Sequence, residues 1–193
     1  MRRILVAFWY SIIRVWVKLF KPRMLYFYRH QGNVIPTTRV SNSTVITDAK
    51  NLNLGNAVFI GHYNFIESSN GITIEEGVQL TNYISVLTHS SHQSIRLYGY
   101  EYLNHSDLIG YRKGSVSIGM FSFIGPHVTI LPGTKIGKGS IVSAYSMVSG
   151  AFPEFAIIAG NPAVVIGDTR EKDNELLAKH PELMEFYKCW AEN

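Results

Sequence analysis

Cysteine is nearly absent from this chain of 193 residues, and the single Cys189 excludes an intrachain disulfide and any metal cluster built from several cysteines. This composition fits a reducing compartment, so we expect a cytoplasmic protein. Nucleic-acid-binding motifs are also lacking, and a formal charge of +4 is too small to indicate a nucleic-acid partner. The mild positive charge instead suits a small anionic partner or a lipid surface.

The N-terminal thirty residues lack an apolar run that could cross a bilayer. The uncharged run Ile4–Ile13 is much shorter than the about 20 residues that a membrane span needs. No small-residue cleavage pattern follows it, which disfavours a removable signal peptide. On a helix, the small and cationic residues would form one stripe beside an apolar surface rich in Trp and Phe: Arg3, Ala7, Ser11, Arg14, Lys18 and Lys21. This wheel predicts an amphipathic helix that either contacts a membrane surface or packs on a neighbouring subunit.

What the chain does have is a six-residue repeat from residue 116 to residue 153. Six aliphatic residues recur at this spacing: Ile118, Ile124, Ile130, Ile136, Val142 and Val148. Small or β-branched residues lie two positions before each of them: Val116, Ser122, Val128, Thr134, Ser140 and Ser146. Glycine directly follows three of the aliphatic residues, at Gly119, Gly125 and Gly137.

A period of six fits neither an amphipathic helix nor a half-buried strand. It is the period of a chain coiled into a triangular prism, with one short strand on each face. We expect the aliphatic side chains to point inward and stack on their equivalents in the next coil, and the small residues to lie near the corners. Glycine is expected because it tolerates the strained backbone of the turn. Each coil buries its apolar edge only against its neighbours, so the fold is a solenoid.

The same period extends upstream with interruptions. Aliphatic residues keep the spacing from Leu54 to Ile66 and from Ile74 to Val86, and two-residue slips separate these blocks from one another and from Ile46. Bulged corners can absorb such slips. The period then vanishes between Val86 and Ile118, where a polar and aromatic excursion occupies residues 88–115. A long excursion inside a regular solenoid predicts a functional loop.

Three short runs, in a fixed order, point to a family. Thr88-His89 opens the excursion, F-I-G-P-H-V-T-I-L-P-G occupies 123–133, and A-G-N-P-A occupies 159–163. With the repeats, they resemble the hexapeptide-repeat acyltransferases, and within these the O-acetyltransferases of sugars and bacterial surface polysaccharides. The resemblance covers about residues 40–167. It implies an all-β fold, a left-handed parallel β-helix, in a homotrimer whose active sites lie between subunits.

The resemblance also implies a mechanism in which His89 is the general base. Acyl transfer from acetyl-coenzyme A to a hydroxyl needs a proton acceptor, and an imidazole serves near neutral pH. The family's histidine takes the proton of the acceptor, which attacks the thioester directly, without an acyl-enzyme. An ordinary loop histidine is the alternative for His89. Further residues implied to contact the coenzyme A donor are Phe123, Ala144, Ala159, Gly160, Asn161 and Pro162. Phe123 replaces the tryptophan common in the family, and no basic residue follows the G-N-P-A run, so Lys135, Lys138 or Arg170 is expected to hold the phosphates.

The acceptor is expected to be a carbohydrate held by the excursion. Tyrosine offers a flat face with a hydroxyl, and arginine a planar fork. Candidates in the excursion are His92, Arg96, Tyr98, Tyr100, Tyr102, Tyr111 and Arg112. These groups are equally able to pack the loop on a neighbouring subunit. At coil edges, Asn64, Glu67 and Asn82 are candidates to orient the acceptor or His89, and no spacing singles one out.

The sequence therefore predicts three segments: an N-terminal helical segment at 1–30, a β-helix domain at 31–167, and C-terminal helices at 168–193 that cover the open end of the prism. The expected function is O-acetylation of a sugar in a bacterial surface polysaccharide or its precursor, with peripheral membrane contact through residues 1–20. Transfer to a free sugar or amino sugar is an alternative. A zinc hydrolase like the carbonic anhydrases of the same fold is disfavoured, because no third histidine joins His89 and His92 convincingly, so no metal is expected. A non-catalytic binding protein on the same scaffold is a further alternative.

Overall fold

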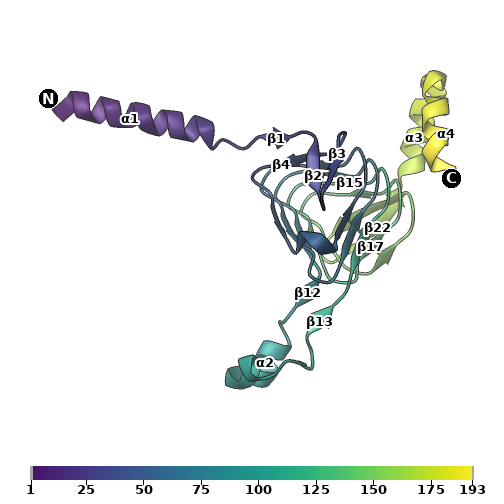
Figure 1. The fold of residues 1–193 in the computed structure, drawn as a ribbon. Helices are drawn as coiled ribbons and strands as arrows, with labels where there is room; N and C mark the ends of the chain where they lie inside the picture. Colours follow the sequence, from purple (N-terminus) through teal and green to yellow (C-terminus); the bar gives the residue numbers. More distant parts are fainter. Residues whose placement is uncertain (1, 193) are drawn as a thin grey trace.

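The computed structural model describes residues 2–192 and consists mainly of three sheets that form the walls of a triangular coil (Figure 1). The first sheet has eight strands: β1 (Met24–Leu25), β4 (Arg39–Ser41), β7 (Phe59–Ile60), β10 (Gln79–Leu80), β15 (Phe123–Ile124), β18 (Ile141–Val142), β21 (Ala156–Gly160) and β22 (Ala163–Asp168). The second has β5 (Val45–Thr47), β8 (Phe65–Glu67), β11 (Ser85–Leu87), β16 (Thr129–Ile130) and β19 (Met147–Val148). The third has β6 (Leu52–Leu54), β9 (Ile72–Ile74), β14 (Val116–Ile118), β17 (Lys135–Ile136) and β20 (Ala151–Phe152).

The chain visits the three sheets in turn, so neighbouring strands from successive coils are parallel. The exceptions are the two edge strands of the first sheet, because β1 is antiparallel to β4 and β22 is antiparallel to β21. Leu80 is in register with Ile60 on one side and Ile124 on the other, and Ile124 with Val142. All four side chains are fully buried. The predicted inward stacking of the aliphatic repeat positions is therefore confirmed, and the small residues two positions earlier are buried as well.

The glycines that follow the aliphatic residues have a different role from the one expected. Gly119, Gly125 and Gly137 do not have positive φ. A Cβ at Gly125 would lie 2.7 Å from the backbone nitrogen of Ala144 in the next coil, and the other two glycines are as tightly approached. These positions need glycine because two backbones pass too close for any side chain, not because the turn is strained.

The positive φ values of the coil lie two residues later in each turn, and aromatic residues often hold them. Tyr63, Tyr83, His127 and Tyr145 have φ between 59° and 61° and occupy equivalent places in four successive coils. Their rings stack in a column, with centroids 5.1, 4.9 and 4.7 Å apart. Stacking between coils therefore accompanies a conformation that non-glycine residues seldom adopt.

The prism has three corners, which we name by their contents. The aromatic corner joins the first sheet to the second and carries the stacked column (residues 61–64, 81–84, 125–128 and 143–146). The excursion corner joins the second sheet to the third (48–51, 68–71, 88–115 and 131–134). The C-terminal corner joins the third to the first (55–58, 75–78, 119–122, 137–140 and 153–155). Both two-residue slips in the sequence fall at the excursion corner, one of them in the short helix η1 (Ala49–Asn51).

The excursion leaves the prism as a two-stranded antiparallel ribbon. Its strands are β12 (His89–Ser90) and β13 (Arg112–Lys113), and its tip holds α2 (Ser94–Tyr98) and the 3-10 helix η2 (Gly99–Asn104). The flanking strands β11 and β14 keep their register with neighbouring coils. The excursion is therefore an insertion that the coil accommodates without displacement.

The N-terminal segment begins with helix α1 (Arg2–Leu19), which extends away from the prism (Figure 1). Among residues 2–192, no helix combines the length and apolar character needed to cross a bilayer. A hairpin of β2 (Tyr28–His30) and β3 (Asn33–Ile35) follows, and Tyr28 and Ile35 pack against the core. His30 lies 2.7 Å from the carbonyl oxygen of Leu52, so this hairpin covers the first coil.

The C-terminal helices are α3 (Thr169–Lys179), the 3-10 helix η3 (Pro181–Leu183) and α4 (Met184–Ala191). The ring of Trp190 lies 4.9 Å from that of Phe121 and 5.8 Å from that of Phe155, and Thr169 donates a hydrogen bond to the carbonyl of Gly139. These contacts place the helices along the C-terminal corner, rather than across the open end as the sequence led us to expect. Met1 and Asn193, the ends of the two predicted terminal segments, lie outside the described residues.

Candidate active site

His89 is placed at the excursion corner by the register of the coils. It is the first residue of β12, directly after the buried Thr88, where the chain leaves the second sheet. Leu87 pairs with Glu67 of the preceding coil, so the residues that follow Leu87 lie beside the turn that follows Glu67. The base candidate and a carboxylate about twenty residues upstream are thus brought together by coil stacking.

Glu67 forms an ion pair with His89. Its Oε2 lies 2.8 Å from Nδ1 of the imidazole, and its side chain is only 9% exposed while that of His89 is 36% exposed. Glu67 also accepts hydrogen bonds from the backbone N–H and hydroxyl of Thr88 and from the backbone N–H of Ser69. The carboxylate is therefore held from several directions and fixes the imidazole with Nδ1 turned inward.

These contacts set the charge of Glu67. Burial of the carboxylate raises its pKa, but hydrogen bonds from Ser69 and Thr88 outweigh burial and lower the pKa of Glu67 to about 2. Glu67 is therefore ionised at neutral pH. An ionised carboxylate at Nδ1 favours the tautomer with the proton on that nitrogen, which leaves Nε2 with a lone pair.

The excursion returns to contact the imidazole from the side. The ring of Tyr111 stacks on His89 with centroids 5.6 Å apart and planes inclined by 8°. Lys113 is the cross-strand partner of His89, and its Nζ lies 5.4 Å from the centroid of the Tyr111 ring. Burial raises the pKa of Tyr111, as do the nearby Tyr102 and Glu67, so its phenol is protonated at neutral pH.

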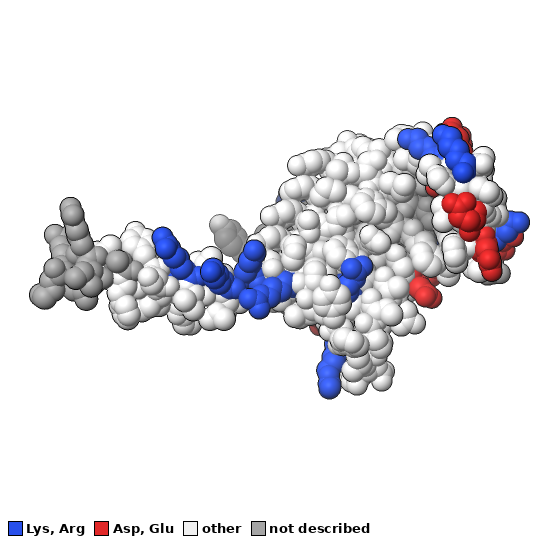
Figure 2. All heavy atoms as spheres, turned by 90° about the horizontal axis from the view of Figure 1, so that it is seen from above, with Lys and Arg blue, Asp and Glu red and all other residues white. Residues whose placement is uncertain are grey.

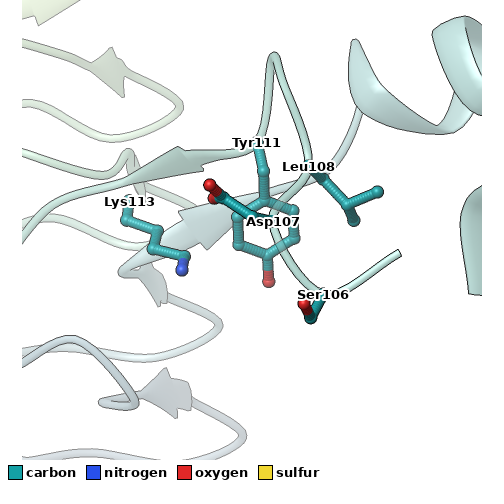
Figure 3. Close-up of a pocket in the computed structure, with 5 residues that line it drawn as sticks. All are labelled: Ser106, Asp107, Leu108, Tyr111 and Lys113. Atoms are coloured by element: carbon teal, nitrogen blue, oxygen red, sulfur yellow. The ribbon is translucent and has the colours of Figure 1, made fainter. Parts of the chain in front are cut away.

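A hollow of about 550 Å³ lies beside this stack, on the excursion. Figure 3 shows Tyr111 at its centre, with the Lys113 ammonium and the Asp107 carboxylate on one side and Ser106 and Leu108 on the other. The hollow offers charged and hydroxyl groups around one aromatic ring. Such a lining is suited to a polar organic molecule rather than a purely apolar one.

Asn64 and Asn82, which the sequence offers as acceptor contacts, bond to the coil itself. The amide of Asn64 is buried, donates to the carbonyls of Gly61 and Thr81 and accepts from the backbone N–H of Ile84. Asn82 accepts from the backbone N–H of His62. Both lie at the aromatic corner, so of the three coil-edge candidates only Glu67 contacts His89.

His92, Arg96 and Tyr98 contact other parts of the excursion. His92 bonds through Nδ1 to the hydroxyl of Ser90 at 2.8 Å, and its carbonyl accepts from Arg96. The Tyr98 hydroxyl accepts from the backbone N–H of Ile109. The structure therefore shows these three side chains holding the excursion together, and places Tyr111 and Lys113 nearer to His89.

The residues expected to contact the donor divide between two corners. Ala144 is exposed at the aromatic corner, and the exposed turn that contains Gly160, Asn161 and Pro162 is tied to the same corner by a hydrogen bond from the Gly160 N–H to Ser146. Phe123 is 41% exposed on the outer face of the first sheet. Within one protomer, the second sheet separates this group from His89.

Lys138 and Arg170 lie instead at the C-terminal corner. Arg170 Cζ is 4.9 Å and Lys138 Nζ 5.9 Å from the centroid of the Phe155 ring. The Asp168 carboxylate accepts hydrogen bonds from Arg170, which raise the pKa of Arg170, and the Lys138 side chain is only 12% exposed. The two cations thus have structural partners in this protomer.

Sequence reasoning named Glu67 without distinguishing it, and did not name Lys113. A signal for Glu67 exists: the slip between Ile66 and Ile74 follows it directly and lengthens the corner below His89. Within residues 2–192, no group of three or more His, Cys, Asp or Glu side chains is arranged to hold a metal ion.

Comparison with known proteins agrees with this architecture. Residues 115–150 match the family described as bacterial transferase hexapeptide (six repeats). The chain is 45% identical over 83 residues to YvoF of Bacillus subtilis (strain 168), by name an acetyltransferase, and the match covers 43% of this chain and 45% of YvoF. It is 45% identical over 60 residues to WbbJ of Escherichia coli (strain K12), by name a lipopolysaccharide biosynthesis O-acetyl transferase, covering 31% of each. The matches thus span less than half of either relative.

Solved structures share the fold. A galactoside acetyltransferase in complex with coenzyme A superposes with a TM-score of 0.58 at 23% identity, covering 68% of this chain and 62% of that one. At this identity the similarity establishes the fold alone. The comparison therefore supports the coiled fold of this chain. Any argument about its chemistry has to come from the side chains described above.

Proposed function

We propose that this chain, which matches the bacterial transferase hexapeptide family over residues 115–150, transfers an acetyl group from acetyl-coenzyme A to a sugar hydroxyl, with His89 as the general base. The observation that carries this proposal is the contact of 2.8 Å between Glu67 Oε2 and His89 Nδ1 at the foot of the excursion. Buried carboxylates that orient an exposed imidazole are typical of sites that move protons. As in the resembling enzymes, the coil is taken to be left-handed.

In this mechanism Nε2 of His89 accepts the proton of the acceptor hydroxyl as its oxygen attacks the thioester carbonyl. The ionised Glu67 stabilises the imidazolium that forms. Collapse of the tetrahedral intermediate breaks the C–S bond, and the imidazolium returns its proton to the leaving thiolate. One C–O bond forms and one C–S bond breaks, and no acyl-enzyme is needed.

A homotrimer would complete the site. His89 and the proposed donor contacts Ala144 and Gly160 lie at different corners of one prism, so a neighbouring copy is required to bring a base and a donor surface together. The walls that meet at the aromatic corner expose large apolar side chains, as expected of a surface that another copy covers: Val45, Phe65, Phe123 and Ile141. Three such head-to-tail contacts close a ring.

The acceptor is proposed to be a bacterial surface polysaccharide or its precursor, assembled on the inner face of the membrane. Helix α1 supports this, because its Trp16 is 58% exposed and Phe20, directly after the helix, is 69% exposed. Figure 2 shows Lys and Arg side chains without acidic neighbours along α1 and at its junction with the prism, while acidic and basic side chains are mixed at the opposite end. A cationic stripe beside aromatic side chains favours peripheral binding to a lipid surface.

The direct test is incubation with labelled acetyl-coenzyme A and a panel of surface glycans, sugars and amino sugars, with mass spectrometry of the products. We expect an O-acetylated sugar, and a loss of about 10²–10⁴-fold in His89→Ala, the usual contribution of a general base. His180→Ala, which alters an exposed histidine on the C-terminal helices, should keep full activity. Full transfer by His89→Ala would overturn the mechanism, and exclusive modification of amines would replace the O-acetyl assignment.

The membrane contact is tested separately by deleting residues 1–20. We expect the shortened protein to lose binding to vesicles that contain anionic lipid and to keep transfer to a soluble acceptor fragment. Unchanged vesicle binding would refute the role of α1, and a change of oligomeric state would instead assign α1 to a neighbouring subunit.

A further inference from the structure

We infer that the hollow lined by Tyr111 and Lys113 is the acceptor subsite, and that it selects a sugar that carries an anionic group, either a carboxylate or a phosphate ester. This inference rests on the proposed function, because it takes His89 as the base that the acceptor must reach. It goes further by naming the residues that choose the acceptor and the chemistry that they choose.

The hollow and the base share a wall. Tyr111 stacks on the imidazole of His89 and also lines the hollow, so a molecule held in the hollow is one aromatic ring away from the proposed proton acceptor. A volume of about 550 Å³ falls in the usual range for small-molecule sites. The ring of Tyr111 offers an apolar face and a phenol that remains protonated, both of which suit a sugar ring.

The charge preference comes from Lys113. No carboxylate of residues 2–192 lies within 4 Å of its ammonium, although Asp107 lines the same hollow. The ammonium lies against the Tyr111 ring, and the ribbon pairing places Lys113 directly across from His89. A cation without an ion-pair partner, beside the base and inside a hollow, is complementary to an anionic group on the molecule that binds there.

The other lining groups fix the orientation of this acceptor. The Asp107 carboxylate repels an anion and accepts hydrogen bonds from sugar hydroxyls, and the Ser106 hydroxyl both donates and accepts. The anionic group therefore lies on Lys113, with sugar hydroxyls toward Asp107 and Ser106 (Figure 3). For transfer, a sugar bound this way has to extend one hydroxyl past the edge of the Tyr111 ring to Nε2 of His89.

The test compares matched acceptors and matched variants. Transfer kinetics are measured on a uronate-containing oligosaccharide, its carboxyl-reduced form and a phosphorylated form of the same neutral sugar. We expect a KM at least about tenfold lower for one of the anionic forms than for the neutral form. Lys113→Met should abolish that preference through KM with little change in kcat, Lys113→Arg should retain it, and Lys179→Met, on helix α3, should leave it intact.

Preference for the uronate or for the phosphate identifies which anion the site takes. Equal KM values for neutral and anionic acceptors would overturn the inference while leaving acetyl transfer established. An equal rise in KM for neutral and anionic acceptors in Lys113→Met would do the same. Calorimetric binding of the anionic sugars without donor separates the two proposals. Binding that depends on Lys113 without any transfer supports the subsite and refutes the proposed chemistry, and an absence of binding together with an absence of transfer refutes both.

Discussion

The aromatic corner and the excursion corner are built on the same coil and do different things. At the aromatic corner, four successive turns have the same length, and their third residues stack ring on ring from Tyr63 to Tyr145. At the excursion corner, the spacing between buried aliphatic residues is two residues longer in the early coils, and one turn is replaced by residues 88–115.

The difference between regular and lengthened turns indicates which part of a solenoid can hold a functional site. A regular turn uses its polar groups to hold the next coil, as Asn64 does when it bonds to Gly61, Thr81 and Ile84. A lengthened turn has side chains that are not needed to hold the next coil. Here such side chains surround the buried carboxylate of Glu67. Three substitutions test this comparison, from the largest expected effect to the smallest.

Gly125→Ala should destabilise the fold most, by about 3 kcal/mol, because its Cβ would lie 2.7 Å from the backbone nitrogen of Ala144 and neither backbone can move away. Unfolding in denaturant, at a fixed protein concentration, measures this. The matched control is Gly133→Ala at the excursion corner, where φ is +83° and no atom lies within 4 Å of the new Cβ. It should cost only about 1–2 kcal/mol, from backbone conformation alone. Equal losses of unfolding free energy in the two variants would show that the backbones of neighbouring coils are no closer at Gly125 than at Gly133.

Glu67→Gln should lower acetyl transfer by about 10- to 100-fold, the equivalent of the 1.5–3 kcal/mol that hydrogen bonds to a charged group contribute. The amide cannot stabilise the imidazolium of His89 as the carboxylate does. Glu76→Gln, at an exposed position of the C-terminal corner, serves as the control and should keep full activity. Activity retained in Glu67→Gln would show that the carboxylate does not position the base.

The effect of Glu67→Gln on the free energy of unfolding should also depend on pH in the acidic range. The pKa of Glu67 is about 2 in the folded protein, below its ordinary value of 4.5. The stabilisation by the ionised carboxylate is therefore fully present above pH 4.5 and is lost as the pH falls toward 2. The difference in unfolding free energy between wild type and Glu67→Gln should shrink across this interval. A difference that stays constant with pH would contradict the hydrogen-bonded ion.

Tyr111→Ala should have the smallest effect, a loss of about 2- to 10-fold in kcat, because ring stacking contributes about 0.5–1.5 kcal/mol. Tyr111→Phe keeps the ring and should retain kcat, so the pair separates stacking from the hydroxyl. A positioning role also predicts a changed pH dependence of kcat in Tyr111→Ala, since the imidazole is held less firmly. Similar kcat in all three proteins would remove Tyr111 from the positioning of His89.

Much of the coil could be predicted from sequence, because a strict spacing leaves few alternatives. The inward positions from Ile118 to Val148 follow from the period alone and are confirmed by burial. The six-residue period could not explain why glycine follows three of these aliphatic residues. Close approach to the next coil depends on the stacking distance between backbones, and a sequence pattern records only that a side chain is missing.

The candidate site was predictable only in part. His89 follows from its place at the edge of the excursion, but its partners lie about twenty residues away in either direction. Glu67 reaches it through the register of β8 and β11, and Tyr111 and Lys113 through the pairing of β12 with β13. The same dependence on three-dimensional register explains why Lys138 and Arg170, expected at the donor site, lie beside Phe155.

The undisturbed register around the excursion has a consequence for how such a protein changes over time. Val86 still pairs with Ile66 and Ile130, and Ile118 with Ile74 and Ile136, although residues 88–115 intervene between the two strands. Selection can therefore lengthen, shorten or exchange this one appendage at little risk to the scaffold. Under the proposed function, the residues that choose the acceptor and the residues that form the coil therefore lie in separable stretches of the gene, which makes the appendage a natural unit for grafting.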